Sequence, residues 1–77
     1  MFDEFIKDMW QVMYDKRIAI KKKELAERIG ISASQLREFV SGRYCSHNVA
    51  EKIADYLNMA MVYTEGKYRL ADKERVR

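Results

Sequence analysis

Apolar residues recur at helical spacing through the first part of this 77-residue chain. Near the N-terminus they stand at positions i, i+3, i+4, i+7 and i+11, which is the spacing of one helix face. The pattern predicts a helix from about Asp3 to about Lys16, with Trp10 and Val12 widening the apolar face. The five positions of that face are Phe2, Phe5, Ile6, Met9 and Met13.

The same period continues in three shorter segments. It predicts a second helix over Lys22 to Ile29, a third from Ala33 to about Ser41, and a fourth that starts near Ser46 or Asn48. Either residue fits as the N-cap of the fourth helix, since Asn48 has Glu51 at capping-box spacing. The residues expected to face inward are Leu25, Ala26, Ile29, Leu36, Phe39, Val40, Val49, Ile53, Ala54 and Leu57.

The pattern changes to alternation in the stretch MAMVYTEGKYRLAD. Alternation around a Glu-Gly pair predicts a β-hairpin. A two-residue turn would pair Tyr63 with Tyr68 and Met61 with Leu70 on one apolar side. Glu-Gly is a weaker turn signal than Asn-Gly, so a bulged turn with a shifted register stays open.

Gly30 separates two of the predicted helices by a very short turn. Glycine adopts the left-handed conformation without a Cβ clash, so it can end a helix abruptly. Ile31 then supplies an apolar anchor, Ser32 offers an N-cap to the next helix, and the small Ala26 allows a close helix approach. This is the arrangement of the DNA-binding helix-turn-helix, whose second helix enters the major groove.

These elements predict a mainly α fold, a compact bundle of four to five helices with a helix-turn-helix and a C-terminal β-hairpin. The length suits a single domain over residues 1–77. We expect the helical bundle over 1–58, the hairpin over 59–71 and a flexible basic tail over 72–77.

Charge singles out the same central segment. Residues 16–43 carry eight basic and three acidic side chains, a net charge of +5, whereas residues 1–15 carry −3 and residues 44–77 carry +1. One-sided positive charge favours a polyanionic partner, although a solvated face of an ordinary domain would look the same. One cysteine permits no intrachain disulfide, and no apolar run approaches about 18 residues, so we expect a cytoplasmic protein without membrane contact.

The segment from Ile20 to Met59 resembles the phage lambda repressor and Cro-like helix-turn-helix family. Counted from Lys22, six constrained motif positions carry the expected residue types: Leu25, Ala26, Gly30, Ile31, Leu36 and Phe39. The resemblance implies operator binding as a dimer and a role in transcriptional regulation. The chain departs from the family in having Lys21 and Lys22 where a Ser or Thr cap and a Gln are usual, and Cys45 where proline is common.

The candidate DNA-binding residues lie on and around the second helix of the motif. Arg37 can bind guanine O6 and N7 bidentately, although an ion pair with Glu38 or another helix is the alternative. The lysines favour phosphate, and the resemblance implies backbone contacts after the helix. The full set is Lys21, Lys22, Lys23, Ser32, Ala33, Ser34, Gln35, Arg37, Glu38, Ser41, Arg43 and Tyr44.

A homodimer on a palindromic double-stranded DNA operator is expected. A lone two-stranded hairpin is marginal in water, so its apolar side must pack on its own helices or on a second subunit. The candidate dimer residues are Met61, Tyr63, Tyr68 and Leu70.

Other chemistry has little support. Cys45 and His47 have no second Cys or His to complete a metal site, so we expect no metal, no cofactor and no enzyme activity. A different function on the same fold remains open: a protein-binding module, such as an antirepressor or an inhibitor of a nucleic-acid enzyme. Glu38 on the reading face and the acidic first helix favour this alternative.

Overall fold

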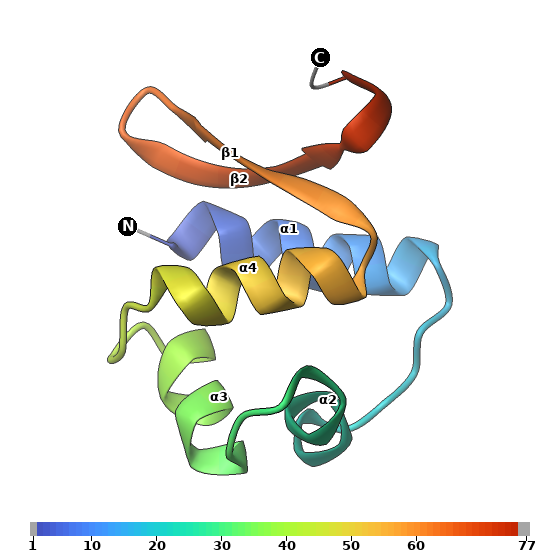
Figure 1. The fold of residues 1–77 in the computed structure, drawn as a ribbon, viewed down its shortest axis with the longest axis vertical. Helices are drawn as coiled ribbons and strands as arrows, with labels where there is room; N and C mark the ends of the chain where they lie inside the picture. Colours follow the sequence, from blue (N-terminus) through green and yellow to red (C-terminus); the bar gives the residue numbers. More distant parts are fainter. Residues whose placement is uncertain (1, 76–77) are drawn as a thin grey trace.

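The computed structural model describes residues 2–75. The helices are α1 (Asp3–Asp15), α2 (Lys22–Ile29), α3 (Ala33–Val40) and α4 (His47–Tyr56), followed by β1 (Met59–Thr64), β2 (Lys67–Asp72) and a 3-10 turn η1 (Lys73–Arg75). Figure 1 shows α1 and α4 in a middle layer, the hairpin on one side of them, and α2 and α3 on the other. The predicted fold class, helical with a C-terminal hairpin, is confirmed.

One apolar core joins these layers. All five positions predicted for the apolar face of the first helix are buried, and so are nine of the ten inward positions predicted for the other helices. Val40 is half-buried, and Trp10 keeps 40% of its surface exposed, so it widens the apolar face only in part. Phe2 lies at the centre of an aromatic group, with its ring centroid 5.3 Å from Phe39 and 4.7 Å from Tyr68.

The turn between α2 and α3 has the predicted geometry. Gly30 adopts the left-handed conformation at φ +78°. The amide of Gly30 donates to the Glu27 carbonyl at 3.3 Å, and the amide of Ile31 donates to the Ala26 carbonyl at 3.0 Å. These two bonds satisfy carbonyls that would otherwise be unpaired at the helix end, so the chain turns within two residues.

The C-terminal end of α3 and the N-terminal end of α4 are also determined by local hydrogen bonds. Gly42, at φ +84°, ends α3, and the Arg43 amide donates to the Glu38 carbonyl at 3.0 Å. The hydroxyl of Ser46 accepts from the Val49 amide at 3.2 Å. Of the two caps considered for α4, Ser46 is therefore the one that forms.

The hairpin has the register of a two-residue turn, with Tyr63 paired to Tyr68 and Met61 to Leu70. The turn residues Glu65 and Gly66 both have positive φ, +52° and +78°. The second strand continues to Asp72 and η1 follows it, over positions where we expected a flexible tail. Residues 76 and 77 of that predicted tail lie outside the described residues.

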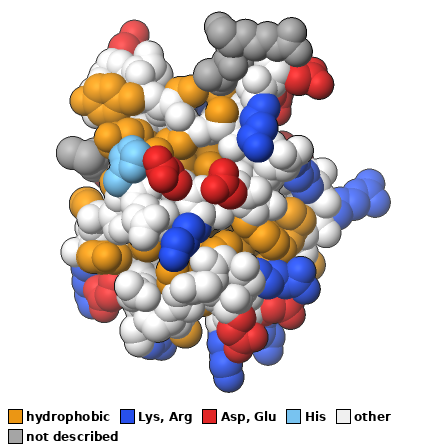
Figure 2. All heavy atoms as spheres, viewed as in Figure 1, with side chains coloured by type: hydrophobic (Ala, Val, Ile, Leu, Met, Phe, Trp, Pro, Cys, Tyr) orange, Lys and Arg blue, Asp and Glu red, His pale blue; other side chains and the backbone are white. Residues whose placement is uncertain are grey.

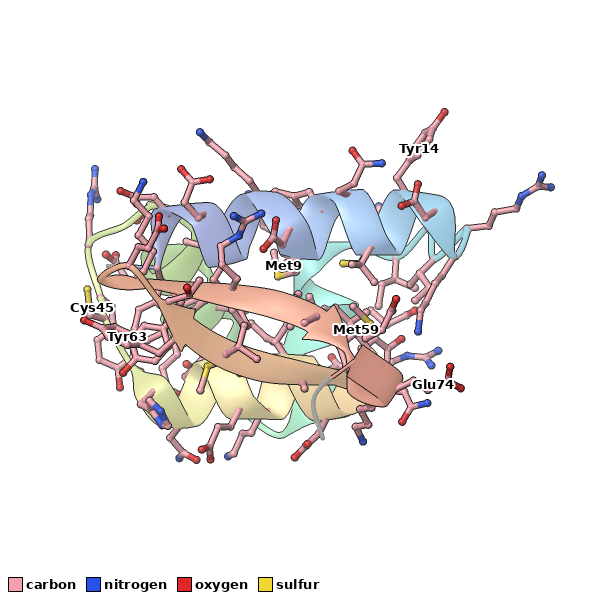
Figure 3. All side chains as sticks on the ribbon, turned by 90° about the horizontal axis from the view of Figure 1, so that it is seen from above. Met9, Tyr14, Cys45, Met59, Tyr63 and Glu74 are labelled. Atoms are coloured by element: carbon pink, nitrogen blue, oxygen red, sulfur yellow. The ribbon has the colours of Figure 1, made fainter. Side chains whose placement is uncertain are left out.

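The hairpin lies across α1 and α4, as the view in Figure 3 shows. Asp8 of α1 accepts from Arg69 Nε at 2.7 Å, from Arg69 Nη2 at 3.0 Å and from the Leu70 amide at 3.1 Å. The Asp8 carboxylate raises the pKa of Arg69 above its ordinary value, because it accepts hydrogen bonds from the charged guanidinium and attracts it. These contacts hold the hairpin on the side of the molecule away from α3.

Candidate nucleic-acid interface

The third helix presents one side to the core and the other to solvent. Leu36 and Phe39 are fully buried, which fixes the rotation of α3 about its axis. The opposite side carries the exposed residues Ser34, Arg37, Glu38 and Ser41. This short helix stands beside α2 at the end of the molecule opposite the hairpin (Figure 1), with its outer side exposed. It therefore has the placement that a major-groove helix requires.

Arg37 is not engaged in the ion pair that we considered as its alternative role. Its Nη2 atom donates to the Ser34 hydroxyl at 3.3 Å, one helical turn away. Within residues 2–75 its guanidinium forms no salt bridge with Glu38 or with another helix. The remaining donors of Arg37 are available to a ligand, and the bond to Ser34 lays the side chain along the outer face of α3.

Three other candidates on α3 use their polar atoms within the chain. Ser32 and Gln35 form a reciprocal capping box: the backbone amide of Gln35 donates to Ser32 Oγ at 3.0 Å, and the backbone amide of Ser32 donates to Gln35 Oε1 at 3.1 Å. Ser41 Oγ donates to the Glu38 carbonyl at 2.9 Å. These bonds orient and terminate the helix that carries Arg37. Ala33, the remaining candidate at the start of α3, is half-buried.

The three lysines lie exposed where α2 begins. Lys21 is the N-cap residue, and its side chain forms no capping hydrogen bond. The amides of the first turn of α2 are therefore not satisfied by a cap, and the partial positive charge of the helix N-terminus adds to that of Lys21, Lys22 and Lys23. This combination suits a phosphate group.

Arg43 and Tyr44 follow α3, and backbone hydrogen bonds hold them close to it. Their backbone amides both donate to the Glu38 carbonyl, at 3.0 and 3.1 Å. Tyr44 is 40% exposed and lines a shallow hollow together with Ser34, Gln35 and Glu38. The sequence predicted only that Tyr44 contacts the DNA backbone. It did not predict the hollow, because the hollow depends on how the loop after Gly42 folds back.

Surface charge is distributed as the segment charges suggested. Figure 2 shows Lys and Arg side chains around the half of the molecule that holds α2 and α3, with acidic side chains between them. In the hairpin, Arg69 is paired with Asp8, whereas Lys67 stays exposed. The segment with the largest positive excess, residues 16–43, includes both helices of the helix-turn-helix.

The candidate dimer residues are placed differently from one another. Met61, Tyr68 and Leu70 pack against the core of their own chain and are partly buried there. Tyr63 is 62% exposed, and its ring lies 4.9 Å from that of Tyr68. The apolar side of the hairpin thus contributes to the core of the monomer and keeps part of its surface exposed.

Two further features concern metals and membranes. In the described part of the chain, no group of three or more His, Cys, Asp or Glu side chains is placed to hold a metal ion. Cys45 is exposed, and His47 lies 3.3 Å from Glu51. None of the helices within residues 2–75 has the length and apolar character needed to cross a membrane.

Comparison with known proteins agrees with this geometry. A family model described as the Cro/C1-type HTH DNA-binding domain matches residues 8–61, well over half of the chain. The match includes α2, the glycine turn, α3 and α4. It confirms the resemblance identified from the motif positions. Searches of curated proteins and of solved structures returned no match.

Proposed function

Because the chain belongs to the Cro/C1-type helix-turn-helix DNA-binding domain family, we propose that it is a sequence-specific repressor of phage or mobile-element type. In this proposal α3 lies in the major groove of a double-stranded operator and reads base edges there. Family membership supports DNA binding and transcriptional regulation in general. The observation that carries the base-reading role is Arg37, which lies exposed on the outer side of α3 without an ion pair.

The division of labour within the interface follows from chemistry. Arg37 donates two hydrogen bonds to guanine O6 and N7, and Ser34 meets the neighbouring base edge or phosphate. Lys21, Lys22 and Lys23 bind the phosphate backbone and fix the orientation of the domain. Arg43, held at the end of α3, extends the phosphate contacts. Ser32 and Gln35 act by holding the first turn of the reading helix.

The proposal includes a homodimer on a palindromic site. One helix-turn-helix spans only a half-site, and two copies about 34 Å apart read a full operator. The hairpin is the candidate interface, because its sheet has only two strands and Tyr63 stands exposed on β1. Sedimentation of the full chain at tens of micromolar tests this: we expect a dimer that Tyr63→Lys converts to a monomer. A monomeric wild-type chain, or a variant that still dimerises, contradicts it.

Selection of bound fragments from random DNA tests the function itself. We expect a palindromic consensus, and Arg37→Ala should relax the preference at one position per half-site at a cost of about 1–3 kcal/mol. Lys67→Ala is the matched control, since it removes one exposed positive charge from the hairpin end. Equal effects of the two substitutions would remove Arg37 from the reading role.

A protein-binding module on the same fold is the second candidate. The observation that favours it is the exposed carboxylate of Glu38 on the outer side of α3, because this negative charge repels the phosphate backbone of DNA. Such a module would yield no enriched DNA sequence in the same selection. The two candidates are therefore separated by one experiment.

A further inference from the structure

The hollow beside α3 combines an apolar surface with one carboxylate. Ser34, Gln35, Glu38 and Tyr44 line it, and its exposed walls are mainly apolar. Ser34, one of the lining residues, also accepts a hydrogen bond from Arg37 Nη2 at 3.3 Å, so the hollow adjoins Arg37 and a base pair next to the one at Arg37 can reach it. A ligand for this place must tolerate an aromatic wall and satisfy the carboxylate.

The backbone of Tyr44 is held at the end of α3 by hydrogen bonds. Gly42 turns the chain at the end of α3, and the Tyr44 amide then donates to the Glu38 carbonyl at 3.1 Å. The Gln35 Oε1 atom accepts from the Ser32 backbone amide in the capping box, so this oxygen does not compete with the Glu38 carboxylate as an acceptor in the hollow. The backbone that frames the hollow is therefore fixed by hydrogen bonds within the chain.

Glu38 is the one acidic side chain among these lining residues, and nothing in the described chain neutralises it. No salt bridge or side-chain hydrogen bond within residues 2–75 involves its carboxylate. An ionised carboxylate only accepts hydrogen bonds. Beside a polyanion it weakens binding unless a donor meets it, so its presence at this position selects for a base edge that presents a donor.

Cytosine is the base whose major-groove edge matches both properties. It presents the N4 amino group as a donor, with the nonpolar C5 edge beside it. Guanine presents two acceptors, thymine presents the O4 acceptor, and adenine presents the N7 acceptor next to its amino group. Resting on the proposed function, we propose that Glu38 and Tyr44 form a cytosine subsite, in which Glu38 accepts from N4 and the Tyr44 ring packs against the C5 edge.

Selection from random DNA with the full chain and its variants tests the subsite. The wild type should select cytosine at one fixed position per half-site. Glu38→Gln should change that preference to adenine, because an amide side chain can bind adenine N6 and N7 bidentately. Glu38→Ala should lose about 10-fold in discrimination at that position only, and Tyr44→Ala should weaken the cytosine site more than random DNA.

Glu27→Gln is the matched control, because it removes one exposed negative charge from α2. It should leave the cytosine preference intact. If Glu38→Gln alters affinity only as Glu27→Gln does, with no change of base, the subsite is overturned while the proposed function stands. If the wild-type chain enriches no sequence, the proposed function is overturned and the subsite with it.

Discussion

Two arginines at opposite ends of this molecule differ in what they bind. At the helix-turn-helix end, Arg37 bonds only to a neighbouring serine and the three lysines stand exposed. At the hairpin end, Arg69 is bound by both oxygens of Asp8. The contrast indicates that the hairpin end stabilises the fold and that the helix-turn-helix end is available for a ligand. Positive charges without a partner inside the protein are the ones that a polyanion can bind.

Protonation does not disturb this contrast near neutral pH. Asp8 raises the pKa of Arg69, so folding favours the charged guanidinium. A group whose pKa is raised by folding stabilises the folded state at low pH and loses that effect only as pH rises through the folded-state value. For arginine that value lies far above neutral. We expect the contribution of Arg69 to stability to be constant between pH 6 and 8.

The largest predicted effect is the loss of stability in a core variant, which should unfold both ends of the molecule together. Phe39 of α3 is fully buried, and its ring lies 5.3 Å from Phe2 and 6.1 Å from Phe5. Phe39→Ala should cost about 3–5 kcal/mol and unfold both ends in one transition, as followed by circular dichroism and amide exchange. Tyr14→Ala, at a side chain that is 81% exposed and projects outward in Figure 3, should change stability little. Hairpin amides that remained protected in Phe39→Ala would show that the ends have separate cores.

A smaller effect is expected at the start of the reading helix. Ser32→Ala removes one half of the capping box and should destabilise the protein by about 1 kcal/mol in urea unfolding. Ser34→Ala is the control on the same helix, because its hydroxyl accepts only from the exposed Arg37 side chain. Equal losses of stability for the two serines would contradict the structural role assigned to Ser32.

The salt dependence of DNA binding tests the role of the three lysines at the helix-turn-helix end. Changing Lys21, Lys22 or Lys23 to Gln should weaken binding to specific and random DNA alike. Each lost phosphate contact should reduce the slope of log K against log salt by about 0.9 in magnitude. Fluorescence anisotropy at several salt concentrations measures this slope. A loss confined to the specific site would show that the lysines are not phosphate contacts.

The smallest effect concerns the hairpin turn. Glu65 has φ +52°, a conformation that disfavours most side chains but suits Asn in a turn where both central residues have positive φ. Glu65→Asn should therefore stabilise the protein by about 0.5 kcal/mol and leave DNA affinity unchanged. Thermal unfolding checks the first part, with Glu74→Asn as a control outside the turn. A destabilised Glu65→Asn variant would contradict the strain argument.

Local features of the fold were predictable because local chemistry determines them. Gly30 ends α2 as its residue type suggests, Ser32 caps α3, and the two-residue turn sets the strand register. The capping role of Gln35 was also visible in principle, since Gln three residues after Ser is a capping-box signature. We had assigned that side chain to DNA instead.

Long-range features were not predictable from the pattern. Asp8 and Arg69 are 61 positions apart, and nothing in the alternation of the hairpin indicates that β2 will lie on α1. For the same reason the alternation left open whether the apolar side of the hairpin packs on its own helices or on a second subunit, and the structure shows Met61, Tyr68 and Leu70 partly buried against their own core. The hollow beside Tyr44 also depends on the path of a loop. Such features depend on tertiary packing. The pattern of apolar and polar residues in one sequence carries little information about that packing.

One paired measurement tests the central claim that the helix-turn-helix end binds DNA while the hairpin end holds the fold. Arg37→Ala and Arg69→Ala each remove one guanidinium, and both variants are measured for thermal unfolding and for affinity to the selected operator. We predict that Arg37→Ala weakens operator binding about 10-fold or more without changing the unfolding temperature. Arg69→Ala should lower the unfolding temperature without changing operator affinity below it, because Arg69 and the candidate dimer residue Tyr63 belong to opposite faces of the hairpin. An Arg37→Ala variant with undiminished operator affinity, or an Arg69→Ala variant that loses affinity while folded, would contradict the account.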